Sequence, residues 1–172
     1  MKMKVQEMNV DNKRIVLRCD FNVPIKDGVI LDDTKIVASL ETINYLVSKN
    51  CRVIILSHLG KVKSEEDKLK NSLAVVAKRL NELVESNVIF STTTRSPELE
   101  MRVKALQPRE ILVVENTRFE DYPQKLESGN DIQLASYWAS LGDIFVMDAF
   151  GSSHRCHAST AGIAKFLPSC IG

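Results

Sequence analysis

RIVLRCDFN, residues 14–22, is the stretch that decides the fold. Its first part is aliphatic and β-branched, which is typical of a buried strand. Two polar residues, Asp20 and Asn22, follow that strand directly. The same order recurs three times along the chain: residues 53–56 precede SHLGK, residues 111–114 precede ENTRF, and residues 144–146 precede MDAFGSSHRCH. The sequence therefore predicts several buried strands that each end in a polar loop.

Helical patterns separate these strands. Apolar residues at helical spacing, or after helix-capping residues, predict four helices, at residues 36–47, 73–84, 96–106 and 132–141. A shorter helix-like run covers residues 161–167. The cap candidates are Asp32, Asp33 and Thr34 for the first helix, Ser72 for the second and Ser96 for the third. A further short strand is expected at residues 88–90. Alternating strands and helices predict a mostly parallel sheet covered by helices. We expect one α/β domain over residues 1–172, with a three-layer α/β/α, doubly wound, Rossmann-like fold.

Two segments depart from this alternation. IKDGVI, residues 25–30, centres on Asp27-Gly28, which favours a tight hairpin turn. KVKSEEDKLK, residues 61–70, is charged and mixed in sign, which is typical of a solvated loop. We expect a small flap at the first segment and a loop over most of the second.

Composition narrows the possible functions. The chain has 172 residues, 44% apolar and 26% charged, with a net charge of +1, so no overall field favours nucleic acid or an anionic membrane. No apolar run reaches the length of a membrane span, and the N-terminus lacks the apolar core of a signal peptide. The four cysteines form no C-x-x-C pair, which favours a reduced, cytoplasmic protein.

The residues that follow the strands are mostly polar and cationic. Because ligands bind outside the carboxyl ends of parallel strands, we expect these side chains to lie at one edge of the sheet. They are Asp20, Asn22, His58, Lys61, Arg118, His154, Arg155 and His157. Arginine makes paired hydrogen bonds to phosphate and carboxylate, and helix N-termini add amide donors. The pattern predicts a socket for a small, multiply charged anion.

Each of these residues alone has a simpler interpretation. His58 alone would be a turn histidine, Asp20 a turn cap, and Arg118 a surface partner of Glu120. Other chemistries fit less well. His154, Cys156 and His157 have no second ligand pair at zinc spacing, so no metal site is expected. The chain has no G-x-S-x-G elbow, no phosphate-binding P-loop and no G-x-G-x-x-G motif, so neither a hydrolase nor a nucleotide site is expected.

The polar motifs, taken in order, resemble a known family. RCDFNVP, DDTKI, SHLGK, ENTRF and DAFGSSHRCHASTAGI are similar to the N-terminal half of phosphoglycerate kinase, over residues 14–168. The resemblance implies an acid-substrate domain that holds 3-phosphoglycerate or 1,3-bisphosphoglycerate. It also implies a C-terminal domain that holds Mg-ADP or Mg-ATP, so that the two substrates exchange a phosphoryl group in glycolysis. It assigns substrate contacts to Asp20, Phe21, Asn22, Lys35, His58, Leu59, Gly60, Lys61, Arg118 and Arg155.

Three departures from the family pattern affect these expectations. The chain ends at LPSCIG, where the family's hinge begins, so the nucleotide domain is missing and the fragment should be inactive alone. Lys35 stands where the family usually has the arginine that stabilises the transferring phosphoryl group, so the resemblance makes Lys35 the catalytic candidate. Lys61 and Val62 stand where arginine and proline are usual. The alternative is a non-catalytic module that binds a phosphorylated acid or a partner protein. The resemblance also implies a monomer.

Overall fold

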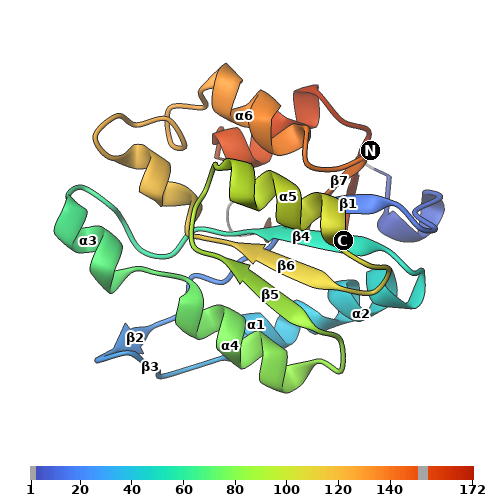
Figure 1. Ribbon diagram of the computed structural model, residues 1–172, viewed down its shortest axis with the longest axis horizontal. Coiled ribbons are helices and arrows are strands. Elements are labelled where there is room, and N and C mark those ends of the chain that lie inside the picture. Colours follow the sequence, from blue (N-terminus) through green and yellow to red (C-terminus); the bar gives the residue numbers. More distant parts are fainter. Residues whose placement is uncertain (1–2, 151–154) are drawn as a thin grey trace.

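Six parallel strands form the central sheet. A computed structural model describes residues 3–150 and 155–172, and the sheet lies within them (Figure 1). The strands are β1 (Arg14–Arg18), β4 (Arg52–Leu56), β5 (Val88–Ser91), β6 (Ile111–Val114), β7 (Ile144–Met147) and β8 (Ser169–Ile171). Their order is β5-β6-β4-β1-β7-β8, and every pairing in this sheet is parallel. The predicted parallel sheet is confirmed, although the sequence pattern did not reveal β8.

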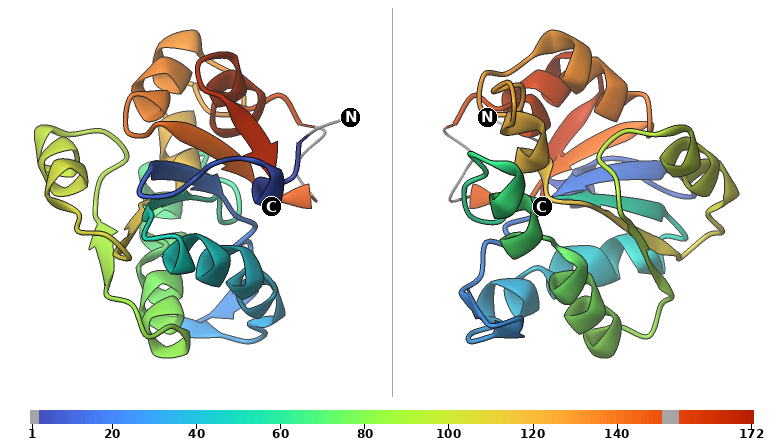
Figure 2. Two further views of the ribbon diagram at one scale, coloured as in Figure 1. Left: turned by 90° about the vertical axis from the view of Figure 1, so that its right-hand side faces the viewer. Right: turned by 60° about the vertical axis from the view of Figure 1, so that its left-hand side comes forward.

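Helices cover both faces of the sheet, as the two views of Figure 2 show. One face carries α1 (Thr34–Ala38), α2 (Leu40–Ser48) and α4 (Ala74–Leu83). The other carries α5 (Pro97–Ala105), α6 (Ile132–Ala139), η4 (Ala158–Gly162) and η5 (Ile163–Lys165). Successive strand residues alternate between the two cores: Ile15 and Leu17 face the first, and Val16 faces the second. The expected three-layer α/β/α fold is confirmed.

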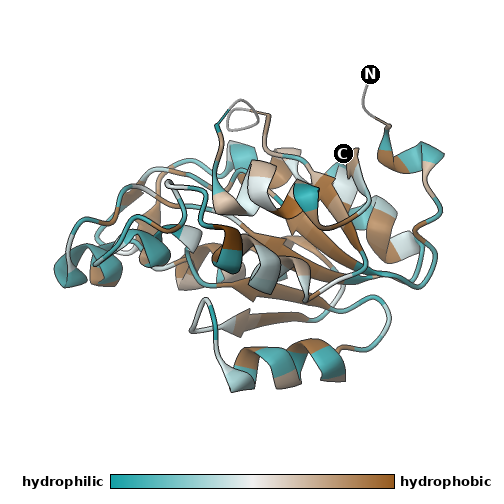
Figure 3. Ribbon diagram, turned by 90° about the horizontal axis from the view of Figure 1, so that it is seen from above, coloured by the Kyte–Doolittle hydropathy of each residue, from teal (hydrophilic) through white to brown (hydrophobic). Residues whose placement is uncertain are grey.

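Burial explains why the strands show no polar alternation. All four residues of β6 and of β7 are buried, and so are the last four residues of β1 and β4. A parallel sheet with helices on both faces has no water-facing side, so its strands are apolar throughout. In Figure 3 the strands are mostly hydrophobic, whereas the surrounding helices and loops carry the hydrophilic residues.

Local capping signals set several helix starts. Ser96 caps α5, as expected, by accepting a hydrogen bond from Leu99 N at 3.0 Å. The expected cap Ser72 lies one residue before the N-cap of α4, which is Leu73, although its hydroxyl accepts from Ala74 N at 3.2 Å. The helical pattern over residues 36–47 is divided into α1 and α2 at Ser39. The Ser39 hydroxyl donates to Ile36 O at 2.6 Å, a local bond that competes with the helical pattern.

The expected hairpin is confirmed, but the charged segment differs from its prediction. β2 (Ile25–Lys26) pairs antiparallel with β3 (Val29–Ile30) across a turn in which both central residues have positive φ. The charged run of residues 61–70 is not all loop, because Glu65–Lys70 forms α3. Ser64 caps α3 by accepting from Asp67 N at 3.2 Å, and acidic residues precede basic ones along the helix dipole.

The helix-like run at residues 161–167 also differs in detail. It is covered by the π-helical turn η4 and the 3₁₀ turn η5 instead of a regular helix. Two further 3₁₀ turns are η1 (Val5–Glu7) and η2 (Thr117–Asp121). Within residues 3–150 and 155–172, every helix is too short or too polar to cross a lipid bilayer.

Candidate functional site

The polar loops converge on one cavity at the carboxyl ends of the strands. The loops follow β1, β4, β6 and β7, which are neighbours in the sheet. The cavity has a volume of about 330 Å³, near the lower end of the range for small-molecule sites. Its lining residues are Asp20, Asn22, Lys35, His58, Gly60, Lys61, Arg118 and Arg155. Eight of the ten residues expected at the substrate site therefore meet at one place, including His58, Arg118 and Arg155.

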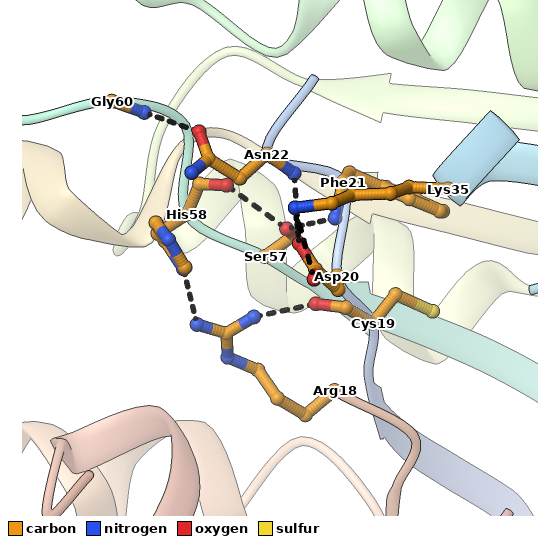
Figure 4. Close-up of polar contacts among 9 residues, drawn as sticks. All are labelled: Arg18, Cys19, Asp20, Phe21, Asn22, Lys35, Ser57, His58 and Gly60. Atoms are coloured by element: carbon orange, nitrogen blue, oxygen red, sulfur yellow. Dashed lines mark hydrogen bonds and ion pairs between the residues drawn. The ribbon is translucent and has the colours of Figure 1, made fainter. Parts of the chain in front are cut away.

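The loop after β1 builds one wall, which Figure 4 shows in detail. Asn22 donates its backbone N–H to Asp20 Oδ1 at 3.2 Å and accepts Gly60 N–H on its side-chain oxygen at 2.9 Å. Lys35 Nζ, from the first turn of α1, lies 3.3 Å from Asp20 Oδ2. The Lys35 side chain is 50% exposed, so this ion pair is weak and leaves the ammonium group available to a ligand.

Asn116 joins the loops after β4 and β6. Its side-chain oxygen accepts from Leu59 N at 3.1 Å and from Arg118 N at 3.0 Å, and its amide nitrogen donates to Leu59 O at 2.7 Å. Gly60 adopts φ +60°, a conformation that favours glycine. Sequence reasoning did not single out Asn116, and its only signal in the sequence is an asparagine in the polar loop that follows β6.

Arg118 is buried, and it has no acidic partner in the part of the chain that the structure describes. It is 8% exposed, its Nη1 donates to Gly60 O at 3.3 Å, and its Nε has no partner among the described residues. The alternative of a surface ion pair with Glu120 is wrong, because Glu120 binds Arg95 at 2.7 Å instead. A buried, unpaired guanidinium is costly unless a ligand compensates it. Arg118 is therefore suited to bind an anion.

His58 contributes a hydrogen-bond donor to the cavity, not a charge. Arg18 Nη2 lies 2.8 Å from His58 Nδ1, and a guanidinium can only donate, so Nδ1 is unprotonated. Burial, together with the neighbouring guanidinium groups of Arg18, Arg118 and Arg155 and the titratable ring of His157, lowers the pKa of His58 to about 2. The neutral ring carries its proton on Nε2. The expectation that this histidine adds positive charge is corrected.

His157, the other histidine that the structure describes, adds no charge to the cavity lining. His157 is buried beside the cavity residues, and burial lowers its pKa. It is not among the residues that line the cavity. His154 lies outside the described residues. Among the described residues that line the cavity, the positive charge comes from Lys35, Lys61, Arg118 and Arg155, against the single carboxylate of Asp20.

Behind the cavity lies a polar network that sequence reasoning missed. Arg18, at the end of β1, is fully buried and donates from Nε to Ser159 Oγ at 2.9 Å. Ser159 in turn donates from its backbone N–H to Glu127 Oε1 at 2.8 Å. Both Ser159 and Glu127 are fully buried. The only sequence signal was an arginine that ends an otherwise aliphatic strand, and nothing in the sequence indicated its partners.

Phe21 and Leu59 do not line the cavity. Both side chains are buried in the core on the α1, α2 and α4 face of the sheet. The Phe21 N–H donates to Ser57 Oγ at 2.9 Å, and the Leu59 backbone binds Asn116, so both residues shape the site through their backbone. Among residues 3–150 and 155–172, no three His, Cys, Asp or Glu side chains gather in a way that could hold a metal ion.

Comparisons with known proteins agree with the fold and with the order of the loops. The family model described as phosphoglycerate kinase matches residues 5–172. The phosphoglycerate kinase of Listeria innocua is 54% identical over 171 residues, which cover 99% of this chain and 43% of that protein. The phosphoglycerate kinase of Lacticaseibacillus casei is 55% identical over 164 residues, 95% of this chain and 41% of that protein.

Solved structures give the same result. The phosphoglycerate kinase from Coxiella burnetii superposes with a TM-score of 0.84 at 37% identity, over 100% of this chain and 42% of that chain. The enzyme from Pyrococcus horikoshii OT3 also has a TM-score of 0.84, at 29% identity, over 99% of this chain and 42% of that chain. The chain thus spans less than half the length of these relatives, and it belongs to the phosphoglycerate kinase family.

Proposed function

We propose that this chain is the acid-substrate half of a phosphoglycerate kinase. It binds 3-phosphoglycerate or 1,3-bisphosphoglycerate in the cavity at the carboxyl ends of β1, β4, β6 and β7. The reaction is reversible phosphoryl transfer between 1,3-bisphosphoglycerate and ADP, a step of glycolysis. The observation that carries the proposal is the convergence of four cations and a neutral imidazole donor, from α1 and from the loops after β4, β6 and β7, on one small cavity.

The arrangement of charges suggests how the acid is oriented. Arg118 and Arg155, with Lys61 beside them, offer fork-shaped and point charges for a phosphate group. Asp20 and Asn22 instead offer uncharged or acidic partners: their oxygens can accept from hydroxyl groups, and the Asn22 amide can donate to a carboxylate. The His58 Nε2–H adds a directed hydrogen bond. An acid with a phosphate at one end and a hydroxyl and carboxyl at the other fits this division.

Lys35 takes the catalytic role in this proposal. Its ammonium group lines the cavity next to Asp20, and it supplies a positive charge for the phosphoryl group as it transfers. An arginine that contacts the moving group contributes about 10³–10⁵ in rate in well-studied phosphoryl transfer. Lysine keeps the charge but lacks the planar fork, so we expect Lys35 to support binding better than turnover.

The magnesium nucleotide belongs outside this chain in the proposal. No three His, Cys, Asp or Glu residues of the described segments gather as a metal site, and the sequence lacks a glycine-rich phosphate loop. The residues present therefore do not fit Mg-ADP or Mg-ATP, and we expect the nucleotide on a C-terminal domain beyond Gly172. The chain alone should form no ATP from 1,3-bisphosphoglycerate and ADP. A cytoplasmic location and a monomeric state stay predictions.

Calorimetric titration with 3-phosphoglycerate at low and high salt tests the proposal. Binding should weaken as salt rises, because cations dominate the cavity. Arg155→Ala should weaken binding by roughly tenfold or more, as expected for one lost charge-assisted hydrogen bond. Lys63→Ala is the matched control, since Lys63 lies in the adjoining charged segment and outside the cavity lining. Equal losses in the two variants, or no heat at millimolar ligand from protein shown folded by circular dichroism, would refute the assignment.

A second function, a binding module without turnover, is favoured by Lys35 and Lys61 at positions where the family resemblance leads one to expect arginine. The two functions differ in the reading frame beyond Gly172. A following domain with a glycine-rich nucleotide loop supports the enzyme, whereas a stop codon or an unrelated domain supports the module.

A further inference from the structure

A continuous chain of buried hydrogen bonds runs from Glu127 to the cavity. Glu127 Oε2 accepts from Ser159 Oγ at 2.5 Å, and Ser159 Oγ accepts from Arg18 Nε at 2.9 Å. Arg18 Nη2 then meets His58 Nδ1 at 2.8 Å. These residues come from the segment after η2, from η4, from β1 and from the loop after β4. Four distant parts of the chain therefore meet along one polar path.

The direction of every proton on this path follows from the groups themselves. A guanidinium has donors only, so Arg18 donates both to Ser159 and to His58. A serine hydroxyl has one proton, and because Ser159 accepts from Arg18, its proton points to the Glu127 carboxylate. His58 accepts on Nδ1, so its proton resides on Nε2. Arg18 therefore donates in both directions along the path, to Ser159 on one side and to His58 on the other.

The surroundings of His58 require this neutral form. Arg18 faces the ring from β1, Arg118 from η2, and Arg155 and His157 from the segment between β7 and η4. A proton on Nδ1 would place two donors against each other at the Arg18 contact. The Nε2 atom has no partner among the described residues, and His58 lines the cavity, so this is the nitrogen that a ligand can reach.

We propose that Glu127 and Ser159 are positioning residues that act through Arg18 to hold His58 as the neutral Nε2–H tautomer facing the cavity. Neither residue touches the ligand. The cavity residues then have two separate roles. Arg118, Arg155 and the lysines supply charge, whereas His58 supplies one directed hydrogen bond that selects the position of an acceptor oxygen. The identity of that ligand rests on the proposed function, but the tautomer of His58 does not.

The tautomer is measured in the ligand-free chain by ¹⁵N-edited histidine NMR. Wild-type His58 should show an unprotonated Nδ1 and a protonated Nε2, and it should stay neutral into acid solution. Ser159→Ala removes the hydroxyl and should yield a mixture of tautomers or an ordinary histidine titration. Ser159→Thr keeps a hydroxyl and should restore the single tautomer. Ser128→Ala, from the same loop as Glu127 but hydrogen-bonded to Asp121, is the control and should leave His58 unchanged.

Ligand affinity gives a second and independent reading. Ser159→Ala should weaken 3-phosphoglycerate binding by about threefold to tenfold, the range for one weakened hydrogen bond, and Ser159→Thr should recover most of the loss. A wild-type Nδ1–H tautomer, or an unchanged His58 spectrum in folded Ser159→Ala, overturns the positioning role. A wild-type Nε2–H tautomer that Ser159→Ala disturbs, in protein that binds no 3-phosphoglycerate, supports the positioning role and overturns only the proposed function. If Ser159→Ala does not fold, Glu127→Gln replaces it. The amide group of glutamine would place an N–H donor against a donor of Ser159, so the hydrogen bonds between the two residues should weaken and the tautomer signal of His58 should also broaden.

Discussion

His58 should make the folding stability of this protein depend on pH in a way that one substitution removes. In the folded protein its pKa is lowered to about 2 by burial and by the cations around it, whereas an ordinary histidine has a pKa of 6.5. The unfolded chain therefore binds a proton on this side chain below pH 6.5 that the folded chain refuses. The stability contribution of the neutral ring is complete above pH 6.5 and is lost as the pH falls.

The magnitude follows from the two pKa values. Each pH unit below 6.5 costs about 1.4 kcal/mol of unfolding free energy as long as the folded ring stays neutral. Between about pH 7 and about pH 5 the loss attributable to His58 is therefore about 2 kcal/mol. His58→Asn should abolish this loss, because the Asn oxygen can accept from Arg18 in place of Nδ1 and asparagine does not titrate.

Urea unfolding followed by the fluorescence of Trp138, a fully buried residue and the sole tryptophan, measures the effect. Wild type and His58→Asn are each unfolded at the two pH values, and the two losses of unfolding free energy are compared. The comparison cancels any constant cost of the substitution and the contribution of titrating groups that do not interact with His58. Wild type should lose about 2 kcal/mol more than the variant. Equal losses in the two proteins would refute the assignment of a neutral, buried His58.

Three other substitutions test separate parts of the site. For the first, this chain is joined to the nucleotide domain of a related phosphoglycerate kinase. Lys35→Arg should then raise kcat by roughly tenfold or more, while the affinity for 3-phosphoglycerate stays within about twofold. An unchanged kcat would exclude a role for Lys35 in phosphoryl transfer. Burial raises the pKa of Asp148 from 3.8 to about 6, so its charge destabilises the fold above that pH and not below 3.8. Asp148→Asn should therefore raise the melting temperature at about pH 8, by about 1 kcal/mol of stability after allowing for its partial exposure, and not at about pH 4; an equal gain at both pH values would contradict this. Gly60→Ala places a Cβ 2.9 Å from Asn71 Oδ1 at φ +60° and should cost about 1–2 kcal/mol in urea unfolding; Gly28→Asn, at φ +76° with open space around it, should cost little, and equal costs would count against strain at Gly60.

The order of elements could be predicted from local pattern because the apolar periodicity of each strand and helix is written in a few consecutive residues. The signals of RIVLR, of the strand at residues 53–56 and of the capping Ser96 before α5 all lie within a few residues of sequence. The same reasoning missed α3, because its mixed charges give no apolar stripe. It also missed β8, because three residues are too short a pattern to recognise and only pairing with β7 makes them a strand.

The sequence by itself determined that the polar loops gather at one edge of the sheet, because parallel strands end at a common edge and the residues after them lie there. The chain alone thus located Asp20, His58, Arg118 and Arg155. Only the tertiary structure decided what state these groups adopt. Arg18 and Ser159, which share a hydrogen bond, are 141 residues apart in the sequence. Glu120, which is close to Arg118 in the sequence, pairs with Arg95 instead. Charge and proton position depend on which groups share a buried space, and that is a property of packing that no local pattern encodes.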